Sequence, residues 1–361
     1  MPEISVLIPY YNDKDFLNKA IESVLSQTFN DFELILLNHA TTDNCREIAH
    51  SYKDPRIRHI DLERNNGAGG GIIFEEFIKN STGNFIKPFC ADDEMEKNCL
   101  EKLYNHFIKH PKCDVVFGDA EFIDSDSKLM NVKWSDNFKD FNLYDKNGDL
   151  LKKYFEPKSF LPYPASMFRR RTAELIDTDK SFIIEFDQSL WIQMLLKQQD
   201  FGFIKDCVIK YRIHENQESS RSKRESIRKY DFYESIFRAK LFFKVENLSF
   251  LKIMTDDFYM IDKLTEKDKE FFPFVIACYY IEKHRNRSCQ IAGYEYIHDI
   301  LQNSAIREKL RNKFEFGIAE FRAMYKNIEV DEPGIKGLLK ILVKKIYKKL
   351  LQDFSLKYEK F

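Results

Sequence analysis

The sequence lacks the features that mark several large classes of protein. Its seven cysteines, an odd number among 361 residues, show no paired-ligand spacing. This argues against a disulfide framework and a structural zinc site, and it fits a reducing compartment. Lysine and arginine number 57 against 58 acidic residues, a net charge of -1, so the overall charge does not indicate a nucleic-acid partner.

Membrane and export signals are also missing. The longest strongly apolar run, residues 271–281, contains Pro273 and is too short to span a bilayer. No basic and apolar leader opens the chain, because Met1-Pro2-Glu3 runs straight into an apolar segment. We therefore expect a cytoplasmic protein that is either soluble or associated with a membrane surface.

Short apolar runs alternate with helical patterns in the first part of the chain. The runs typical of buried strands are residues 4–8, 32–37, 57–60 and 85–89. This alternation predicts an α/β fold, with a mostly parallel sheet covered by helices on both faces. Only amphipathic helical patterns follow Ser219. We expect a domain at residues 1–220 and a helical region at residues 221–361.

Three consecutive carboxylates, Asp92, Asp93 and Glu94, follow the apolar run 85–89. Ligands bind where the strands of a parallel sheet end, and crowded acids repel one another unless a cation or a polar partner joins them. The same acids could cap the helix expected near Lys97, because Asp and Glu favour helix N-termini. The stretch alone fits a metal site and a capping loop equally well.

Two further clusters follow predicted strands. The turn at residues 38–43 fits a nucleotide contact, although simple helix capping explains it equally well. The glycines at 67–71 fit either the close approach of a phosphate or sugar, or a plain tight turn. They do not match the dinucleotide pattern G-x-G-x-x-G, because the last glycine position falls on Ile72.

Two single residues stand out later in the chain. Asp187 lies on the apolar stripe of a predicted helix with Leu190 and Trp191, and a buried acid needs either a partner or a task. A structural pairing with an arginine is the alternative. His214 ends a predicted strand and could supply the nitrogen ligand that a cation at Asp92 and Asp93 would otherwise lack.

In chain order, these clusters resemble a family 2 glycosyltransferase with the GT-A (Rossmann-like) fold, over residues 3–220. The resemblance rests on seven segments: Ile8–Asn12 for the opening P-x-Y-N, Ala20–Thr28 for the first helix, Asn38–Asp43 for the D-D-G-S-T-D turn, Arg64–Gly67 for the N-x-G loop, Gly83–Asp93 for the D-x-D region, Phe186–Asp187 for the E-D pair, and Tyr211–His214. The departures from the pattern are Asn38-His39 for the paired acids, Ala40 for a glycine, Cys90 for the first acid of D-x-D, Phe186 for the glutamate, and Gly69–Ile73 for the usual run after N-x-G.

The resemblance implies an inverting, metal-dependent hexosyltransferase. It would move a hexose or N-acetylhexosamine from a nucleotide sugar, expected to be UDP-linked, to a hydroxyl of a bacterial glycan or lipid-linked glycan. It implies Mn²⁺ or Mg²⁺ held by Asp93, Asp92 and His214, with Asp187 as the general base. Glu94 is left as the helix-capping acid.

The resemblance also implies the residues that contact the substrates. Those on the donor side are Pro9, Tyr11, Asp13, Asn38, Asn66, Gly67, Ala91 and Asp92. Those on the acceptor side are Ser166 and Arg169. An Asn amide at position 38 can still hydrogen-bond a pyrimidine edge, but it lacks the charge of the usual aspartate.

Residues 334–351 predict a basic amphipathic helix, with Leu338 and Leu342 on its apolar face and lysines elsewhere. Such a helix can lie on an anionic membrane surface, which would make the protein peripheral on the inner face of the cytoplasmic membrane. The alternative is a helix packed on its own protein with its lysines in solvent.

Two other functions remain open. A catalytically inactive, sugar-binding or scaffolding relative is compatible with Asn38-His39. A nucleotidyltransferase also combines a parallel sheet with acidic metal ligands, but it normally has a glycine-rich, basic loop after the first strand. This chain has Pro9-Tyr10-Tyr11-Asn12 at that place.

Overall fold

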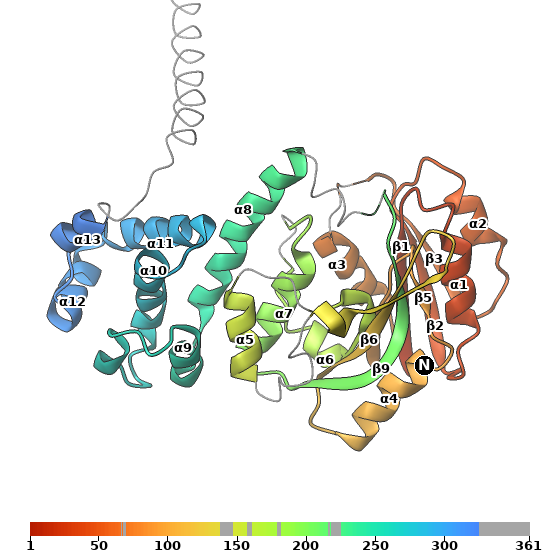
Figure 1. Cartoon of the computed structure of the whole chain (residues 1–361), viewed down its shortest axis with the longest axis horizontal. Coiled ribbons are helices and arrows are strands. Elements are labelled where there is room, and N and C mark those ends of the chain that lie inside the picture. Colours follow the sequence, from red (N-terminus) through yellow and green to blue (C-terminus); the bar gives the residue numbers. More distant parts are fainter. Residues whose placement is uncertain are drawn as a thin grey trace, which may run out of the picture. The chain divides into compact units, whose positions relative to one another are not determined.

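The computed structural model describes residues 1–65, 67, 70–137, 147–156, 161–178, 182–215, 217 and 225–324 (Figure 1). Its contacts divide the chain into two compact units, Met1–Ile297 and a second that begins at His298. The first unit therefore includes helices on both sides of residue 220, and the domain boundary expected there stays a prediction.

Among the described residues, the first unit is built on a nine-stranded mixed sheet. The strands are β1 (Ile4–Tyr10), β2 (Phe32–Asn38), β3 (Ile57–Asp61), β4 (Phe85–Pro88), β5 (Glu94–Met95), β6 (Val115–Ile123), β7 (Leu129–Lys133), β8 (Ser166–Arg169) and β9 (Phe201–Arg212). Their order is β3-β2-β1-β4-β8-β6-β9-β5, and β7 pairs with β6. The first four strands are parallel, as are β6 and β9, whereas β8, β5 and β7 run antiparallel to their neighbours.

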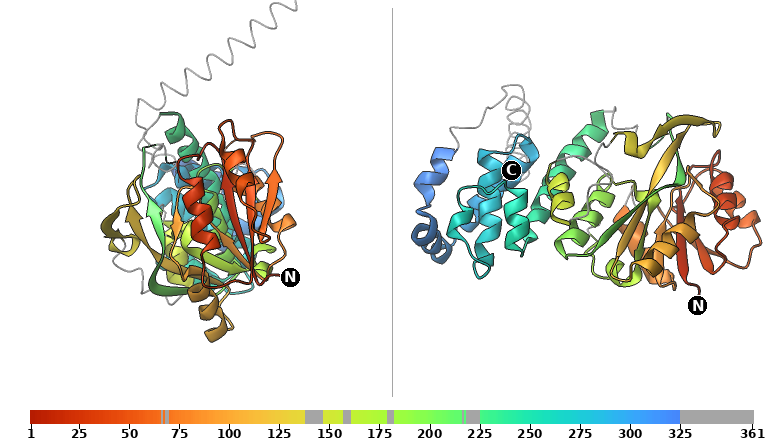
Figure 2. Two further views of the ribbon diagram at one scale, coloured as in Figure 1. Left: turned by 90° about the vertical axis from the view of Figure 1, so that its right-hand side faces the viewer. Right: turned by 60° about the horizontal axis from the view of Figure 1, so that its bottom comes forward.

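Helices cover both faces of this sheet (Figure 2). Those in the first unit are α1 (Leu17–Leu25), α2 (Cys45–Ser51), α3 (Gly70–Asn80), α4 (Cys99–Lys109), α5 (Asn147–Phe155), α6 (Arg170–Ala173), α7 (Phe186–Leu196), α8 (Glu225–Leu241), α9 (Leu248–Met254) and α10 (Phe272–Glu282). The helix α11 (Arg287–Ile300) crosses the division, and the second unit contains α12 (Ser304–Phe314) and α13 (Ile318–Met324). Short 3-10 helices are η1 (Trp134–Asn137), η2 (Tyr163–Ala165), η4 (Phe242–Lys244), η5 (Ile261–Lys263) and η6 (Lys269–Phe271).

The alternation of side chains along the buried strands explains the two layers of helices. On β1, Ile4, Val6 and Ile8 belong to one core cluster with residues of α1, α2 and α4, because successive strand residues point to opposite faces. On the other face, Phe74 of α3 packs against Phe168 of β8, with ring centroids 6.1 Å apart. The chain thus changes faces between β3 and β4, and ligands bind at such a switch point.

The predicted α/β fold with flanking helices and a following helical region is confirmed. The structure adds β8 and α5, which lie in segments where the sequence predicted neither a strand nor a helix. The strand β8 has only four residues, too few to show the alternation of apolar and polar side chains that marks a strand. No helix in the described ranges is both long enough and apolar enough to cross a membrane. The predicted basic helix at residues 334–351 lies outside the described residues.

Candidate active site

The acidic stretch lies where the C-terminal ends of β1 and β4 meet, at the switch point of the sheet. One possible ligand atom from each of Cys90, Asp92 and Asp93 lies within 4.8 Å of the other two. Phe89 hydrogen-bonds Leu7 through its backbone amide (2.9 Å), which places the stretch against the outlet of β1. The sequence prediction that these acids follow a buried strand is confirmed.

Asp93 is the most constrained of the three residues, because its side chain is only 1% exposed. Its Oδ1 accepts a hydrogen bond from the Arg212 backbone amide (2.8 Å). Its Oδ2 is buried and has no hydrogen-bond partner in the described part of the chain. Burial raises the pKa of Asp93 well above its usual range, and the charge of Asp92 raises it further. A buried carboxylate oxygen that lacks a partner and faces other acids fits a divalent cation.

His214 reaches the same cluster from the end of β9. Its Nε2 lies 3.1 Å from Asp92 Oδ2, and its ring lies 4.7 Å from the ring of Phe16. Asp13 also belongs to this group, since burial and then the charge of Asp92 raise its pKa to about 6. The backbone amide of Tyr11 donates to Asp13 Oδ2 (3.0 Å). Asp13 therefore lies within electrostatic reach of Asp92 and His214.

Arg212 is fully buried and hydrogen-bonds the acidic stretch. Its Nε donates to the Asp92 carbonyl (2.7 Å), and its Nη2 donates to Glu94 Oε1 (2.6 Å). The prediction that Glu94 caps the next helix is wrong, because Glu94 lies in β5 and pairs with this arginine. Arg212 was not among the site residues predicted from the sequence. An arginine between Tyr211 and Ile213 at a strand end was the available signal, since a buried charge needs partners.

The turn after β2 is shaped by amide side chains. Asn38 Oδ1 accepts from the Thr41 amide (2.9 Å), and Asn38 Nδ2 donates to Asp61 Oδ1 (2.9 Å). Asn12, at the end of β1, accepts the Thr42 amide through Oδ1 (2.9 Å). Ala40 has a positive φ of 55°, which explains why a glycine is usual at such a position. Asn38 therefore builds the turn and has one amide hydrogen left for a ligand.

The other expected donor residues surround the same outlet. Pro9 lies in β1, Ala91 is buried between Cys90 and Asp92, and Tyr11 is 40% exposed. Gly67 has a positive φ of 82°, a conformation that glycine adopts without strain. Asn66 lies outside the described residues.

The start of α7 lies beside the start of α3. A Cβ atom added to Gly70 would lie 2.8 Å from the side chain of Phe186, so only glycine permits this close approach. Asp187 follows Phe186 in the first turn of α7 and accepts the Gln188 amide through Oδ1 (2.7 Å). Burial raises the pKa of Asp187 to about 6.

Tyr163 connects α7 with the acidic cluster. Burial raises the pKa of its hydroxyl, and Cys90 and then Asp187, in their ionised forms, raise it further. Both groups therefore lie within electrostatic reach of one side chain. Lys87, which is fully buried, donates to the carbonyls of Pro88 (3.0 Å) and Pro164. The end of β4 is thus tied to the turn that carries Tyr163.

The two expected acceptor residues lie at opposite ends of β8. Ser166 begins the strand near the outlet of β4, and its hydroxyl donates to the Tyr163 carbonyl (2.7 Å). Arg169 pairs with Phe85 at the start of β4. Its guanidinium donates to the Cys113 carbonyl (2.9 Å) and lies over the Phe107 ring. Arg169 therefore lies away from the outlet, and we do not carry it into the proposed acceptor site.

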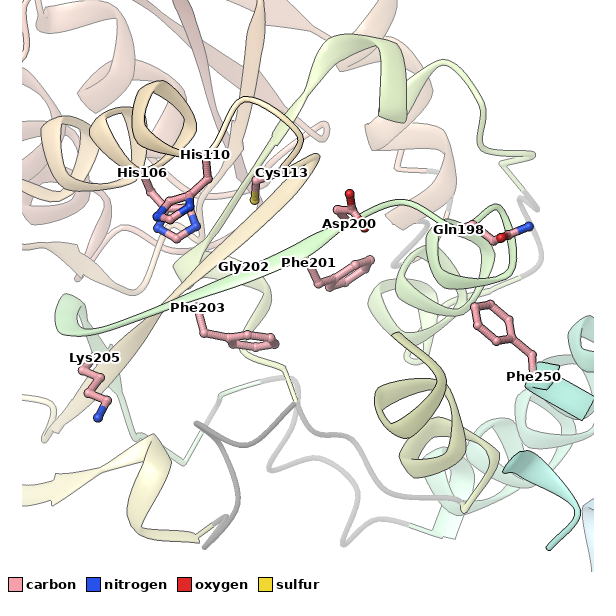
Figure 3. Close-up of a pocket in the computed structure, with 10 residues that line it drawn as sticks. All are labelled: His106, His110, Cys113, Gln198, Asp200, Phe201, Gly202, Phe203, Lys205 and Phe250. Atoms are coloured by element: carbon pink, nitrogen blue, oxygen red, sulfur yellow. The ribbon is translucent and has the colours of Figure 1, made fainter. Parts of the chain in front are cut away.

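A separate hollow of about 690 Å³ opens at the starts of β6 and β9 (Figure 3). The rings of His106 and His110 lie over each other there, with centroids 4.4 Å apart, and Cys113 lies nearby. This hollow is at the opposite edge of the sheet from the acidic cluster. In the described ranges, Cys90, Asp92 and Asp93 form the only close group of three possible metal ligands, so no such group lines the hollow.

Comparisons with known proteins identify the family of the chain. Residues 5–176 match the sequence model of Glycosyl transferase family 2. An uncharacterized glycosyltransferase of Methanocaldococcus jannaschii is 26% identical over 285 residues, which cover 74% of this chain and 95% of that protein. TuaG of Bacillus subtilis, a glycosyltransferase assigned to teichuronic acid biosynthesis, is 24% identical over 249 residues, covering 66% of this chain and 89% of TuaG.

The fold also has a counterpart among solved structures. The crystal structure of S. aureus TarS residues 1–349 with UDP-GlcNAc superposes with a TM-score of 0.55 at 15% identity, covering 86% of this chain and 85% of that one. This likeness shows a shared fold. Because the family match and the shared fold agree with the order of the motifs, residues 5–176 belong to glycosyl transferase family 2, and the chain is a glycosyltransferase with the GT-A fold.

Proposed function

We propose that this glycosyltransferase is inverting and depends on a divalent metal. It transfers a hexose or N-acetylhexosamine from a UDP-linked sugar to a hydroxyl of a bacterial surface glycan or its lipid-linked precursor. TarS was crystallised with UDP-GlcNAc, which supports the donor class. The assignment of TuaG to teichuronic acid biosynthesis supports an acceptor at the cell surface.

The observation that carries the proposal is the buried Asp93 Oδ2 atom without a partner, next to Asp92 and His214. Asp93, Asp92 and His214 would hold Mn²⁺ or Mg²⁺. When bound, the cation offsets the negative charge that develops on the departing diphosphate. Oxygen-rich sites of this kind suit both ions, and the imidazole favours Mn²⁺.

Side chains of the protein would bind the nucleoside and accept the proton of the acceptor. Tyr11, Asp13 and Asn38 would hold the nucleoside at the ends of β1 and β2. Asp187 would take the proton of the acceptor hydroxyl as that oxygen attacks the anomeric carbon from the face opposite the diphosphate. Its pKa of about 6 suits this task, because the carboxylate is ionised at neutral pH yet more basic than an ordinary aspartate.

Calorimetry on the full chain tests the donor site. UDP, GDP and their sugars would be titrated with and without Mn²⁺, first into the native protein and then into Asp93→Asn. We expect UDP and UDP-sugars to bind only with the metal and only to the native protein. Metal-independent binding of the same strength to Asp93→Asn would contradict the proposed metal site.

An inactive sugar-binding relative is the second candidate, because Asn38-His39 replaces the usual pair of acids. Transfer of sugar from UDP-GlcNAc or UDP-glucose to water or to a glycan distinguishes the two. Release of UDP that requires both Mn²⁺ and Asp187 supports the enzyme. Donor binding without UDP release, across several acceptors, would support the inactive relative. The nucleotidyltransferase alternative has no support from the family match.

We also propose a cytoplasmic location, with attachment to the inner face of the membrane through residues 334–351. The support is the basic amphipathic sequence, with six lysines between Lys336 and Lys349. Co-sedimentation with vesicles that contain phosphatidylglycerol, with and without residues 330–361, tests this. Equal binding by the two forms would remove the segment from the proposal.

A further inference from the structure

The helix α8 follows the predicted domain boundary, yet it contacts the segment that leads into α7 (Figure 1). The carboxylate of Glu234, which is 3% exposed, accepts three consecutive backbone amides. Its Oε1 accepts from Ile183 (2.9 Å), and its Oε2 accepts from Ile184 and Glu185 (both 2.8 Å). One side chain thus satisfies backbone amides before a helix, where no intrahelical partner exists.

Arg238, one turn further along α8, makes two contacts of its own with the same region. Its Nε lies 2.8 Å from Glu185 Oε2 in a buried ion pair. Its Nη1 donates to Gln188 Oε1 (3.1 Å). Ser235 adds a hydrogen bond to Glu185 Oε1 (3.0 Å). Residues 183–188 are therefore held on both sides of Asp187 by one face of α8.

The contacts are more extensive than simple packing requires. Burying a charged pair rarely adds much stability compared with apolar side chains of the same size, so the arrangement calls for another purpose. Its geometric effect is to fix the main chain immediately before Asp187 and the side chain immediately after it. A proton acceptor must be held in position to react efficiently, and small displacements are costly.

We propose that Glu234 and Arg238 are positioning residues for Asp187, so that α8 is part of the catalytic apparatus. This inference rests on the proposed role of Asp187 as the base. Glu234 sets the path of the backbone into α7. Arg238 orients the first turn of α7, and its positive charge acts on Asp187. A division of the chain at residue 220 would then separate the base from the residues that position it.

The charged and titratable groups that act on Asp187 come from three elements. Arg238 of α8 lowers its pKa, against the larger effect of burial. The hydroxyls of Tyr154 on α5 and Tyr163 on η2 feel its negative charge, and both stay neutral in the range where Asp187 titrates. Loss of the Arg238 charge should therefore raise the pKa of Asp187.

The first test uses Glu234→Gln in the full chain. The variant is isosteric, but its NH₂ group would face one or two of the backbone amides in place of an accepting oxygen. Hydrogen exchange followed by mass spectrometry should show faster exchange in a peptide covering residues 183–186. With UDP-sugar and Mn²⁺, kcat should fall about tenfold or more, while KM for the donor changes less than about twofold.

Glu33→Gln is the matched control. Glu33 is also a buried carboxylate that accepts a backbone amide, that of Thr82 (2.6 Å), and pairs with Arg58. It lies at the start of β2, at the opposite edge of the sheet from the site. This variant should lose a similar amount of thermal stability but keep its kcat at a temperature where both proteins are folded.

The second test separates charge from structure. Arg238→Met alone leaves Glu185 unpaired and could unfold the protein, so we combine it with Glu185→Gln and compare it with Arg238→Lys. The Met–Gln pair should shift the acid limb of the kcat profile to higher pH, whereas Arg238→Lys, which keeps the charge, should leave the limb in place. A purely structural role would lower kcat by the same factor at every pH.

Three results would overturn the inference, each in a different way. Unchanged exchange at residues 183–186 in Glu234→Gln would show that the carboxylate does not hold this segment. Faster exchange with unchanged kcat would show that the segment does not need to be held. Wild-type transfer by Asp187→Asn would instead reject the proposed base, and the exchange experiment would still report whether Glu234 holds the backbone.

Discussion

The backbone amide of Arg212 donates to Asp93 Oδ1 over 2.8 Å, so the last residue of β9 holds the buried acid that follows β4. The guanidinium of the same residue reaches the carbonyl of Asp92 and the carboxylate of Glu94. One arginine therefore positions three consecutive acids, two of which are the proposed metal ligands. Without this support, the acids would repel one another in the absence of a cation.

Replacing Arg212 should destabilise the protein strongly. Arg212→Met removes the charged partner of Glu94 and the donors to several carbonyls, which should cost about 3–5 kcal/mol in the free energy of unfolding. Urea unfolding measures the change. Arg171→Met is the control, because the Arg171 side chain is 64% exposed and forms an ion pair with Asp114. Its loss should cost about 1 kcal/mol or less. Equal losses in the two variants would contradict the proposed support.

Sequence patterns predicted the buried strands better than the side-chain pairs that join distant parts of the chain. The strands β1, β2 and β4 are runs of apolar residues, and their order with the helices limits the topology. The cluster of Asp92, Asp93 and His214 followed from motif order. The partners of these residues could not be predicted in the same way, because Arg212 and Glu94 are separated by 118 positions and no periodicity reports such a pairing.

Because periodicity does not report long-range pairs, the sequence also predicted a domain boundary near residue 220. Alternation of strands and helices stops near residue 220, so the pattern indicated a separate region beyond it. Glu234 and Arg238 lie on α8, and their partners at the start of α7 come about fifty residues earlier in the chain. In the sequence, a Glu and an Arg four residues apart on a helix are typical of an ion pair on the protein surface. Only the fold shows that both face α7.

Asn38 replaces the usual aspartate because its neighbour is an acid. Its Nδ2 donates to Asp61 Oδ1, and an aspartate at position 38 would bring two carboxylates into contact. Asn38→Asp should therefore lower the free energy of unfolding by about 1–3 kcal/mol. Adding Asp61→Asn should restore most of this loss, because the hydrogen bond returns with the roles exchanged. Urea unfolding of the four proteins gives the coupling energy, and additive losses would contradict the explanation.

Metal removal should abolish donor binding, and the identity of the ion should depend on His214. We expect that EDTA eliminates binding of UDP and that Mn²⁺ restores it. In His214→Gln, affinity for Mn²⁺ should fall more than affinity for Mg²⁺, because only the nitrogen ligand favours manganese. Calorimetric titration of each metal in the presence of UDP measures both. His298→Gln, a change at an exposed histidine in the second unit, is the control and should alter neither affinity.

Ionisation of Asp187 should raise kcat and lower the stability of the folded protein as the pH rises. Its pKa is raised from 3.8 to about 6, so the proposed base is protonated at low pH and kcat should rise through about pH 6 to a plateau. The same shift means that the folded state holds the proton more tightly than the unfolded state does. Between about pH 4 and pH 6 the carboxyl of Asp187 therefore binds more protons in the folded state, and its contribution to stability falls as the pH rises, with no further change above that window.

Asp187→Asn tests both consequences in one protein. At pH 7.5 it should lose about a hundredfold or more in kcat, yet melt at a higher temperature than the native protein, because a carboxylate that burial disfavours is gone. The difference in melting temperature between the variant and the native protein should grow as the pH rises from about 4 to about 6. A variant that is inactive and less stable at pH 7.5 would identify Asp187 as a structural acid. A buried catalytic carboxylate lowers the stability of the folded state, so its removal should raise the melting temperature.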